Sequence, residues 1–332
     1  MTEPLRGGVI GAGVFGGYHA GQYAKLPGEA QPALEPEIRT RMIRFASQQL
    51  VLALLYSLLF DRTEVFFLHR LAPSQEIAFF SISFTLVQYL LLLPQNLANS
   101  ASVSMWVQQG RSPKDAARTA ATSTWFILIF AAPELFGVAA VSDPLLRLIY
   151  GAKYLPAIPV LASLALFGLA LTVSQPAQYM LVGAERQRFY IFWLCLAGAI
   201  DVAGNFLLIP RYGALGATYA KGASEIFGAA GFLAYLLVVF KAKLPIARML
   251  RLLAACVAMF VVVRLVGHRL PPLLTLLVGI PLGAGVFLVL VRLLRCIDGE
   301  DADRLRQMKR LVPAAVRGPY VRVVAFLDPA SA

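Results

Sequence analysis

Apolar stretches of roughly 20 residues recur along most of this chain, and they constrain its fold more than any other feature. From residue 43 onward only short polar segments separate them. A helix needs about 20 mostly apolar residues to cross the hydrocarbon core of a bilayer. We therefore predict an all-α, multi-pass transmembrane helix bundle in a domain that covers residues 39–296. The predicted spans, about eight, are 43–69, 76–107, 117–141, 156–182, 188–209, 214–240, 246–267 and 271–295.

The composition agrees with lipid as the main solvent of the chain. Hydrophobic residues make up 58% of the 332 residues and charged residues 14%, whereas about a quarter of a soluble domain is charged. The formal net charge of +12 would suggest nucleic acid as a partner of a soluble protein. Here the Lys and Arg residues lie in the connectors between apolar stretches. We interpret them as determinants of membrane orientation and predict no nucleic-acid partner.

Connectors rich in Lys and Arg alternate with connectors that carry fewer. Cytoplasmic connectors of membrane proteins carry the excess of basic residues, so we predict that the richer group is cytoplasmic. An even number of spans then leaves both termini in the cytoplasm of a protein that lies in the cytoplasmic membrane. The richer group is the stretch with Arg39, Arg41 and Arg44, the connector with Arg111, Lys114 and Arg118, the connector with Arg186 and Arg188, the connector with Lys241, Lys243, Arg248 and Arg251, and the tail from Arg292.

The tail, residues 297–332, mixes many charged residues with a few apolar ones. Leu305, Met308 and Leu311 are spaced so that they share one face of a helix. This pattern predicts a short amphipathic cytoplasmic helix that lies on the lipid headgroups. A solvated basic tail is the alternative.

The first 38 residues carry a different signal. Gly11, Gly13 and Gly16 form a G-x-G-x-x-G motif, whose spacing lets the backbone approach a pyrophosphate at a helix N-terminus. Residues 7–28 resemble the opening of the glucose-fructose oxidoreductase and inositol dehydrogenase family. A dinucleotide site also needs a second strand and an acidic residue about 20 positions further on, and no strand-like run follows. We interpret residues 1–38 as a vestigial βα fragment and predict no cofactor.

Three stretches of the membrane part resemble polysaccharide exporters. Residues 61–97 look like the seventh and eighth helices of that family, and residues 143–166 look like its next connector and helix. The element "N-x-x-L-I-P-x-x-G-x-x-G-A" of the family is matched by Asn205, Pro210, Gly213, Gly216 and Ala217. The family is the polysaccharide-transporter branch of a superfamily that includes drug/sodium antiporters and lipid-linked oligosaccharide flippases. The resemblance covers about residues 40–325.

The resemblance implies two six-helix lobes, often with two further helices, around a central cavity that opens alternately to each side of the membrane. Such proteins move polyprenyl-diphosphate-linked saccharide from the inner to the outer leaflet. The eight predicted spans correspond to the second lobe and the two further helices. The implied partners are therefore the lipid bilayer, a polyprenyl-diphosphate-linked saccharide, and a separate first-lobe polypeptide or polysaccharide assembly proteins. No enzyme activity is implied.

Ionisable side chains inside spans are costly, so each one is a functional hypothesis. Arg62 is predicted to meet the substrate diphosphate, and the alternative is an interfacial cluster with Asp61 and Glu64. Asp201 and Lys221 are predicted to lie at the same depth and to form an ion pair. This pair would be either a structural clamp or a contact for a cation or diphosphate.

Amide side chains form the rest of the predicted site. Gln88, Gln95 and Asn99 share one helical face, where they either line a cavity for saccharide hydroxyl groups or hydrogen-bond between helices. The same two interpretations apply to Gln175. No metal site is predicted. The full predicted cavity set is Arg62, Gln88, Gln95, Asn99, Gln175, Asp201, Asn205, Lys221 and Glu225.

Three functions remain open from the sequence alone. The first is a flippase for lipid-linked saccharide, with a drug or cation antiporter as its nearest rival in the superfamily. The second is a fragment of an NAD(P)-dependent oxidoreductase fused to a membrane segment. The third is a non-transporting membrane scaffold of a polysaccharide assembly complex.

Overall fold

The computed structural model describes residues 36–58, 63–309 and 314–328, and within these ranges the chain is helical and contains no strand. The predicted all-α membrane bundle is therefore confirmed. The chain divides into two compact units, residues 1–50 and 51–332. Helix α2 (Pro36–Tyr56) begins in the first unit and ends in the second. The predicted βα fragment, with Gly11, Gly13 and Gly16, lies outside the described residues.

Six helical segments of the described chain are long and apolar enough to cross a membrane. Shorter helices connect or follow them. The long helices are α4 (Ser74–Arg111), α5 (Pro113–Ala140), α7 (Ile158–Gly183, preceded by the 3-10 turn η2, Ala152–Ala157), α8 (Gln187–Val238), α9 (Ile246–Gly267) and α10 (Pro272–Leu293), and the short ones are α3 (Thr63–Leu71), α6 (Ser142–Tyr150), α11 (Gly299–Met308) and α12 (Ala314–Leu327).

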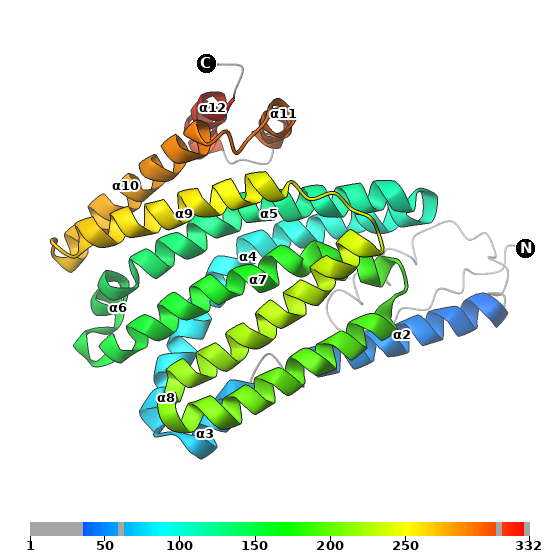
Figure 1. Ribbon diagram of the computed structural model, residues 1–332, viewed down its shortest axis with the longest axis horizontal. Helices are drawn as coiled ribbons and strands as arrows, with labels where there is room; N and C mark the ends of the chain where they lie inside the picture. The colour runs from blue at the N-terminus through cyan, green and yellow to red at the C-terminus, as the bar shows by residue number, and fades with distance from the viewer. Residues whose placement is uncertain (1–35, 59–62, 310–313, 329–332) are drawn as a thin grey trace, which may run out of the picture. The chain divides into compact units, whose positions relative to one another are not determined.

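Helix α8 consists of two arms that reverse direction at Gly213 (Figure 1). Gly213 has φ 53° and ψ −131°, a left-handed conformation that glycine adopts without steric cost. The side chain of Ser224 on the second arm donates a 2.7 Å hydrogen bond to the carbonyl of Ala197 on the first. Glu76 of α4 closes the turn, because its carboxylate accepts a 2.7 Å hydrogen bond from the backbone N–H of Ala214. The predicted spans 188–209 and 214–240 are these two arms.

The first predicted span, 43–69, is not one helix. Helix α2 ends at Tyr56 and α3 begins at Thr63, and residues 59–62 between them lie outside the described ranges. The polar sequence Asp-Arg-Thr-Glu interrupts the apolar run at residues 61–64. Helix α3 then packs against α8.

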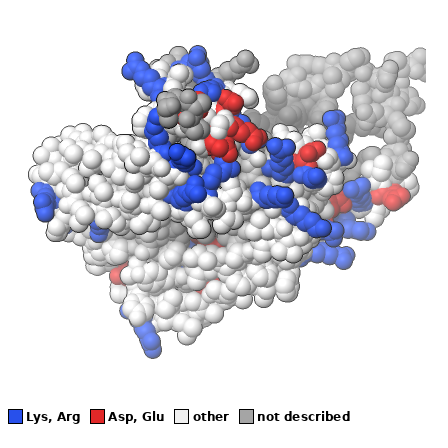
Figure 2. Space-filling model, turned by 45° about the horizontal axis from the view of Figure 1, so that its top comes forward, with Lys and Arg blue, Asp and Glu red and all other residues white. Residues whose placement is uncertain are grey.

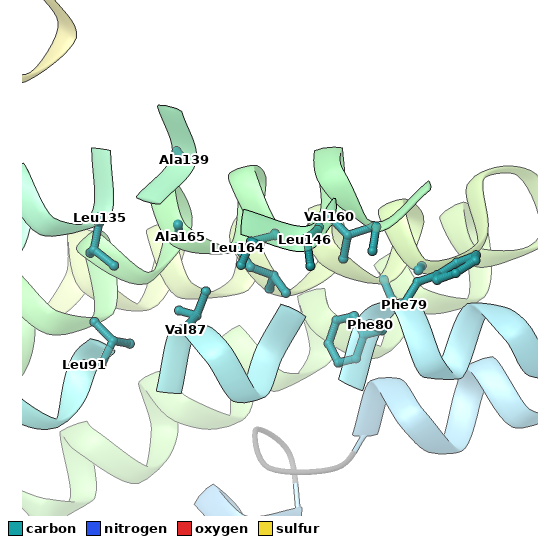
Figure 3. Close-up of a cluster of buried hydrophobic side chains, with 14 of the residues drawn as sticks. Phe79, Phe80, Val87, Leu91, Leu135, Ala139, Leu146, Val160, Leu164 and Ala165 are labelled. Carbon is teal, nitrogen blue, oxygen red and sulfur yellow. The ribbon is translucent and has the colours of Figure 1, made fainter. Parts of the chain in front are cut away.

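Helix α7 is central in the second unit, where it contacts α4, α5 and α8. Figure 3 shows apolar side chains at this junction, where Leu91 of α4, Leu135 of α5 and Leu164 of α7 belong to one buried cluster. Gly168 of α7 lies so close to α4 that an added Cβ would be 3.4 Å from Leu91. Small residues at helix contacts allow this close approach, which is the main source of helix association in lipid.

The apolar face of the tail helix α11 docks on the bundle. Leu305 is buried in the same apolar cluster as Leu128 of α5, and Met308 packs against that cluster. Leu311, the third residue of the predicted face, lies outside the described ranges. The amphipathic helix was thus predicted correctly in type, but its apolar face covers protein. The charged side chains Glu300, Asp303 and Arg306 of α11 are exposed.

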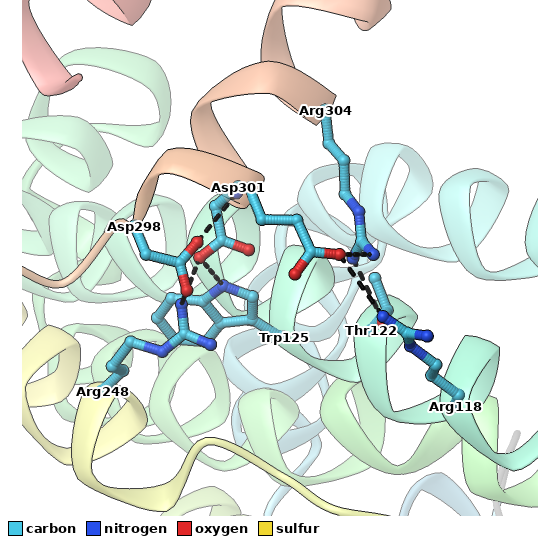
Figure 4. A network of polar contacts seen from close by, with 8 residues as sticks. Arg118, Thr122, Trp125, Arg248, Asp298, Asp301 and Arg304 are labelled. Carbon is cyan, nitrogen blue, oxygen red and sulfur yellow. Dashed lines mark hydrogen bonds and ion pairs between the residues drawn. The ribbon is translucent and has the colours of Figure 1, made fainter. Parts of the chain in front are cut away.

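A polar network ties α11 to α5 and α9 (Figure 4). The indole N–H of Trp125 donates to Asp301 at 2.9 Å, and the Arg248 guanidinium lies 2.5 Å from both Asp298 and Asp301. Burial raises the pKa of the Asp301 carboxyl above its ordinary value. Glu300 joins the network through Arg304 at 2.6 Å.

Replacing Asp301 by Ala is expected to loosen α11. It removes charge-assisted hydrogen bonds from Trp125 and Arg248, each of which contributes about 1.5–3 kcal/mol. Amide hydrogens of α11 should then exchange roughly tenfold to a hundredfold faster, as measured by hydrogen–deuterium exchange mass spectrometry. Asp303→Ala is the matched control, because Asp303 is exposed and pairs only with Arg306 at 2.7 Å within the described chain. Equal acceleration in both variants would contradict the assigned role of Asp301.

Candidate functional site

A cavity of about 470 Å³ opens between α4, α7 and the second arm of α8. Most of the side chains around it are polar, although these helices pack in an apolar bundle. Six of the nine predicted site residues line it. The lining residues are Tyr56, Phe84, Gln88, Gln95, Asn99, Leu171, Gln175, Tyr179, Lys221 and Glu225.

Helix α4 supplies one wall of the cavity. Gln88, Gln95 and Asn99 are seven and four residues apart, so they lie on one face of this helix, and all three line the cavity. The side chain of Asn99 accepts a hydrogen bond from the hydroxyl of Tyr179 on α7. Gln88 and Gln95 make no hydrogen bond to any residue that the structure describes. Their amide groups are therefore available to a ligand in the cavity.

Helix α7 supplies the facing wall with Gln175 and Tyr179. The Oε1 atom of Gln175 is buried and has no hydrogen-bond partner among the described residues. Gln178 points elsewhere, because its amide contacts Ser174 at 2.9 Å and the Tyr190 hydroxyl at 2.5 Å. A buried amide oxygen without a donor is costly, so a ligand hydroxyl would satisfy Gln175.

One end of the cavity is charged. The Lys221 ammonium is 4% exposed and lies 2.9 Å from the carboxylate of Glu64, which is 1% exposed. It also lies 5.2 Å from the centre of the Phe84 ring. Glu225, one helical turn from Lys221, lines the same end. This pair joins α3 to α8 inside the bundle.

The predicted ion pair between Asp201 and Lys221 is not formed. Within the described chain, Asp201 accepts a 3.1 Å hydrogen bond from Asn205 on its own helical arm, and Lys221 pairs with Glu64 instead. Asp201 is close enough to both Lys221 and Glu225 to interact with them electrostatically. The reason for the difference is α3, which supplies Glu64 as the nearer acidic partner of Lys221.

Glu64 is the charged residue that sequence reasoning placed wrongly. One of the two interpretations placed it in an interfacial cluster with Asp61 and Arg62, yet it is buried beside Lys221. The apolar run that directly follows Glu64 indicates burial, although it does not indicate the partner. Asn205, with Asp201, is buried behind the cavity rather than in its wall.

One predicted cavity residue is not described by the structure, and four lining residues were not predicted. Arg62 lies outside the described residues. Sequence reasoning missed the aromatic and apolar lining residues Tyr56, Phe84, Leu171 and Tyr179, since such residues are common throughout an apolar chain. Within the described ranges, no three His, Cys, Asp or Glu side chains are grouped so that they could hold a metal ion.

Comparison with known proteins gives one family and one solved structure. The family model "Polysaccharide biosynthesis protein" matches residues 25–159, a range that includes the α4 wall of the cavity. The family resemblance predicted from the sequence is confirmed. The matched range contains α4 and its amide side chains, whereas the α8 turn lies beyond it. A search of curated proteins found no match.

The solved structure is "Lipid II flippase MurJ, inward closed conformation". The two chains share 20% sequence identity with a TM-score of 0.53, over 64% of this chain. At this identity the likeness concerns the fold. The match covers 47% of the flippase, so this chain spans about half the length of that protein.

Proposed function

We propose that this chain forms part of a transporter that moves a polyprenyl-diphosphate-linked saccharide across the cytoplasmic membrane. The observation that carries the proposal is the amide-lined cavity of about 470 Å³ inside an apolar bundle. Such a cavity offers hydrogen bonds where lipid offers none. The family match supports lipid-linked saccharide as the general class of cargo.

The amide wall suits the saccharide better than the diphosphate. Gln88, Gln95 and Gln175 each offer both donors and an acceptor, which is what sugar hydroxyl groups need. The charged end holds Glu64 and Glu225 beside one lysine, and this balance does not attract a dianionic group. We therefore assign Lys221 to the clamp between α3 and α8. Arg62 stays the predicted diphosphate contact.

Two further parts of the proposal concern topology. Both termini are assigned to the cytoplasm, because the richer basic connectors alternate with poorer ones along the chain. A first-lobe polypeptide, or a second copy of this chain, is assigned the missing side of the transport path, because alternating access needs one repeat to move against another.

The transport proposal predicts a loss of export when the cavity amides are removed. In cells that lack their own polysaccharide flippase, this chain should restore surface polysaccharide, alone or with a first-lobe polypeptide. The variant Gln95→Ala/Gln175→Ala should lower that export about tenfold or more, since each lost hydrogen bond to the sugar contributes about 1 kcal/mol. Surface polysaccharide is measured by quantitative blotting of whole cells at equal protein level.

Asn96→Ala is the matched control for this experiment. Asn96 is exposed on α4 outside the cavity, and its amide bonds only to the carbonyl of Leu92 within the described chain. Its export should equal that of the unchanged protein. If the unchanged chain restores no export, either alone or with a first-lobe polypeptide, and yet co-purifies with assembly proteins, it is a scaffold and not a transporter.

A further inference from the structure

A second and larger cavity, of about 1080 Å³, lies where several spans end. It is bounded by the start of α5, the connector between α8 and α9, the start of α9, and α11. Six basic and four acidic side chains of the described chain line it. Three basic segments that are far apart in the sequence thus meet here: residues 114–118, residues 241–248 and the tail.

The acidic residues of this cavity are mostly paired with arginines. Asp298 and Asp301 hold Arg248, and Glu300 holds Arg304. Asp115 is the remaining acid. Within the described chain, the three lysines of the cavity have no acidic partner. Lys114, Lys241 and Lys243 are exposed and make no ion pair or hydrogen bond to any other residue that the structure describes.

The cavity also has an apolar side. Ala117, Ala121 and Trp125 are each four residues apart on α5, so they form one strip along the helix. Phe240 and Leu244 from the α8–α9 connector add to this apolar side. The strip runs from the end of the span toward its interior. Figure 2 shows Lys and Arg gathered around acidic side chains on this face, next to broad uncharged surface.

We propose that this cavity binds the phosphate-bearing headgroup of a membrane lipid. The three unpaired lysines would contact the phosphate, and the first part of the lipid chain would follow the apolar strip of α5. Basic pockets between membrane helices recognise anionic headgroups in this way. The site is separate from the amide-lined cavity and does not rest on the transport proposal.

Two lipids share the required chemistry. One is an anionic phospholipid of the surrounding bilayer, and the other is a polyprenyl diphosphate. The purified full chain in detergent should be titrated with phosphatidylglycerol, phosphatidylcholine, polyprenyl diphosphate and inorganic phosphate. Native mass spectrometry then counts the molecules bound to each protein.

The test variant is Lys114→Gln/Lys241→Gln/Lys243→Gln. We expect one tightly bound phosphatidylglycerol or polyprenyl diphosphate on the unchanged protein, and a loss of roughly tenfold or more in its affinity in the variant, because each lysine near an anionic headgroup strengthens binding several-fold. The lipid that binds more tightly identifies the natural source. The control Lys153→Gln/Arg211→Gln/Arg269→Gln removes equal charge from exposed residues outside the cavity, and its affinity should not change.

Three results would overturn the proposal. Equal lipid affinity of the unchanged protein and the lysine variant would exclude this cavity as the binding site. An equal loss of lipid affinity in the control variant would show that the net charge of the protein, and not this cavity, determines binding. Displacement of the lipid by inorganic phosphate at the same concentration would show that the lipid chain does not contribute to binding, and equal binding of phosphatidylcholine would show that the negative charge of the headgroup is not recognised. The unchanged protein and the lysine variant should unfold at the same temperature, so that a loss of lipid affinity cannot be due to a loss of folding.

Discussion

Replacing Lys221 by Met is expected to lower the free energy of unfolding by about 3–5 kcal/mol, the usual cost of leaving one member of a buried ion pair alone. The Glu64 carboxylate would remain buried without the ammonium that lies 2.9 Å away. Asp201 and Glu225, which interact electrostatically with Lys221, would lose the same cation. The measurement is unfolding of the purified protein by sodium dodecyl sulfate in mixed micelles, followed by circular dichroism.

A second substitution tests the cause. Glu64→Leu/Lys221→Met removes both charges and should recover most of the loss, because apolar replacements of a buried ion pair are often neutral. Lys153→Met removes an exposed lysine and should change the free energy by less than about 0.5 kcal/mol. If the double variant were as unstable as Lys221→Met, the Glu64 pair would not be the source of the effect.

Replacing Gly216 by Ala is expected to cost about 3 kcal/mol, the upper part of the usual range for overpacking. An added Cβ would lie 2.4 Å from the carbonyl oxygen of Leu208. This contact is with backbone on the opposite arm of α8, which cannot rotate away as a side chain can. The turn would have to open, and with it the hydrogen bond between Glu76 and Ala214. The same detergent titration measures the loss.

Gly285→Ala on α10 is the comparison for Gly216. Nothing lies within 4 Å of its added Cβ, and a helical Gly→Ala change stabilises by about 0.5–1 kcal/mol. Opposite signs for the two variants would show that the close approach of the α8 arms, rather than the residue type, decides the outcome. A neutral Gly216→Ala variant would contradict that account.

Long apolar helices could be predicted almost to the residue. Helix α9 has the same bounds as the predicted span 246–267, and helices α4, α5, α7 and α10 begin and end within a few residues of the predicted apolar stretches. Each segment that crosses lipid needs about 20 mostly apolar residues, so the local composition is sufficient to predict where such a helix lies. The α8 turn was also readable, because Gly213 and Gly216 stand between two apolar arms.

Pairings between distant segments could not be predicted. Nothing local to Glu64 says that α3 turns it toward Lys221, 157 residues away. The amide stripe of α4 was found because helical spacing places Gln88, Gln95 and Asn99 on one face. Tyr179 was missed because its contact with Asn99 joins two helices.

The docking of α11 determines which helices can part from one another. Asp301 is bonded both to Trp125 of α5 and to Arg248 of α9, and Glu300 lies 3.6 Å from Arg118 of α5. At this end, α5 and α9 cannot separate without breaking these contacts. If the proposed transporter opens and closes its amide-lined cavity with these contacts intact, α5, α9 and α11 move together and the hinge lies elsewhere in the bundle.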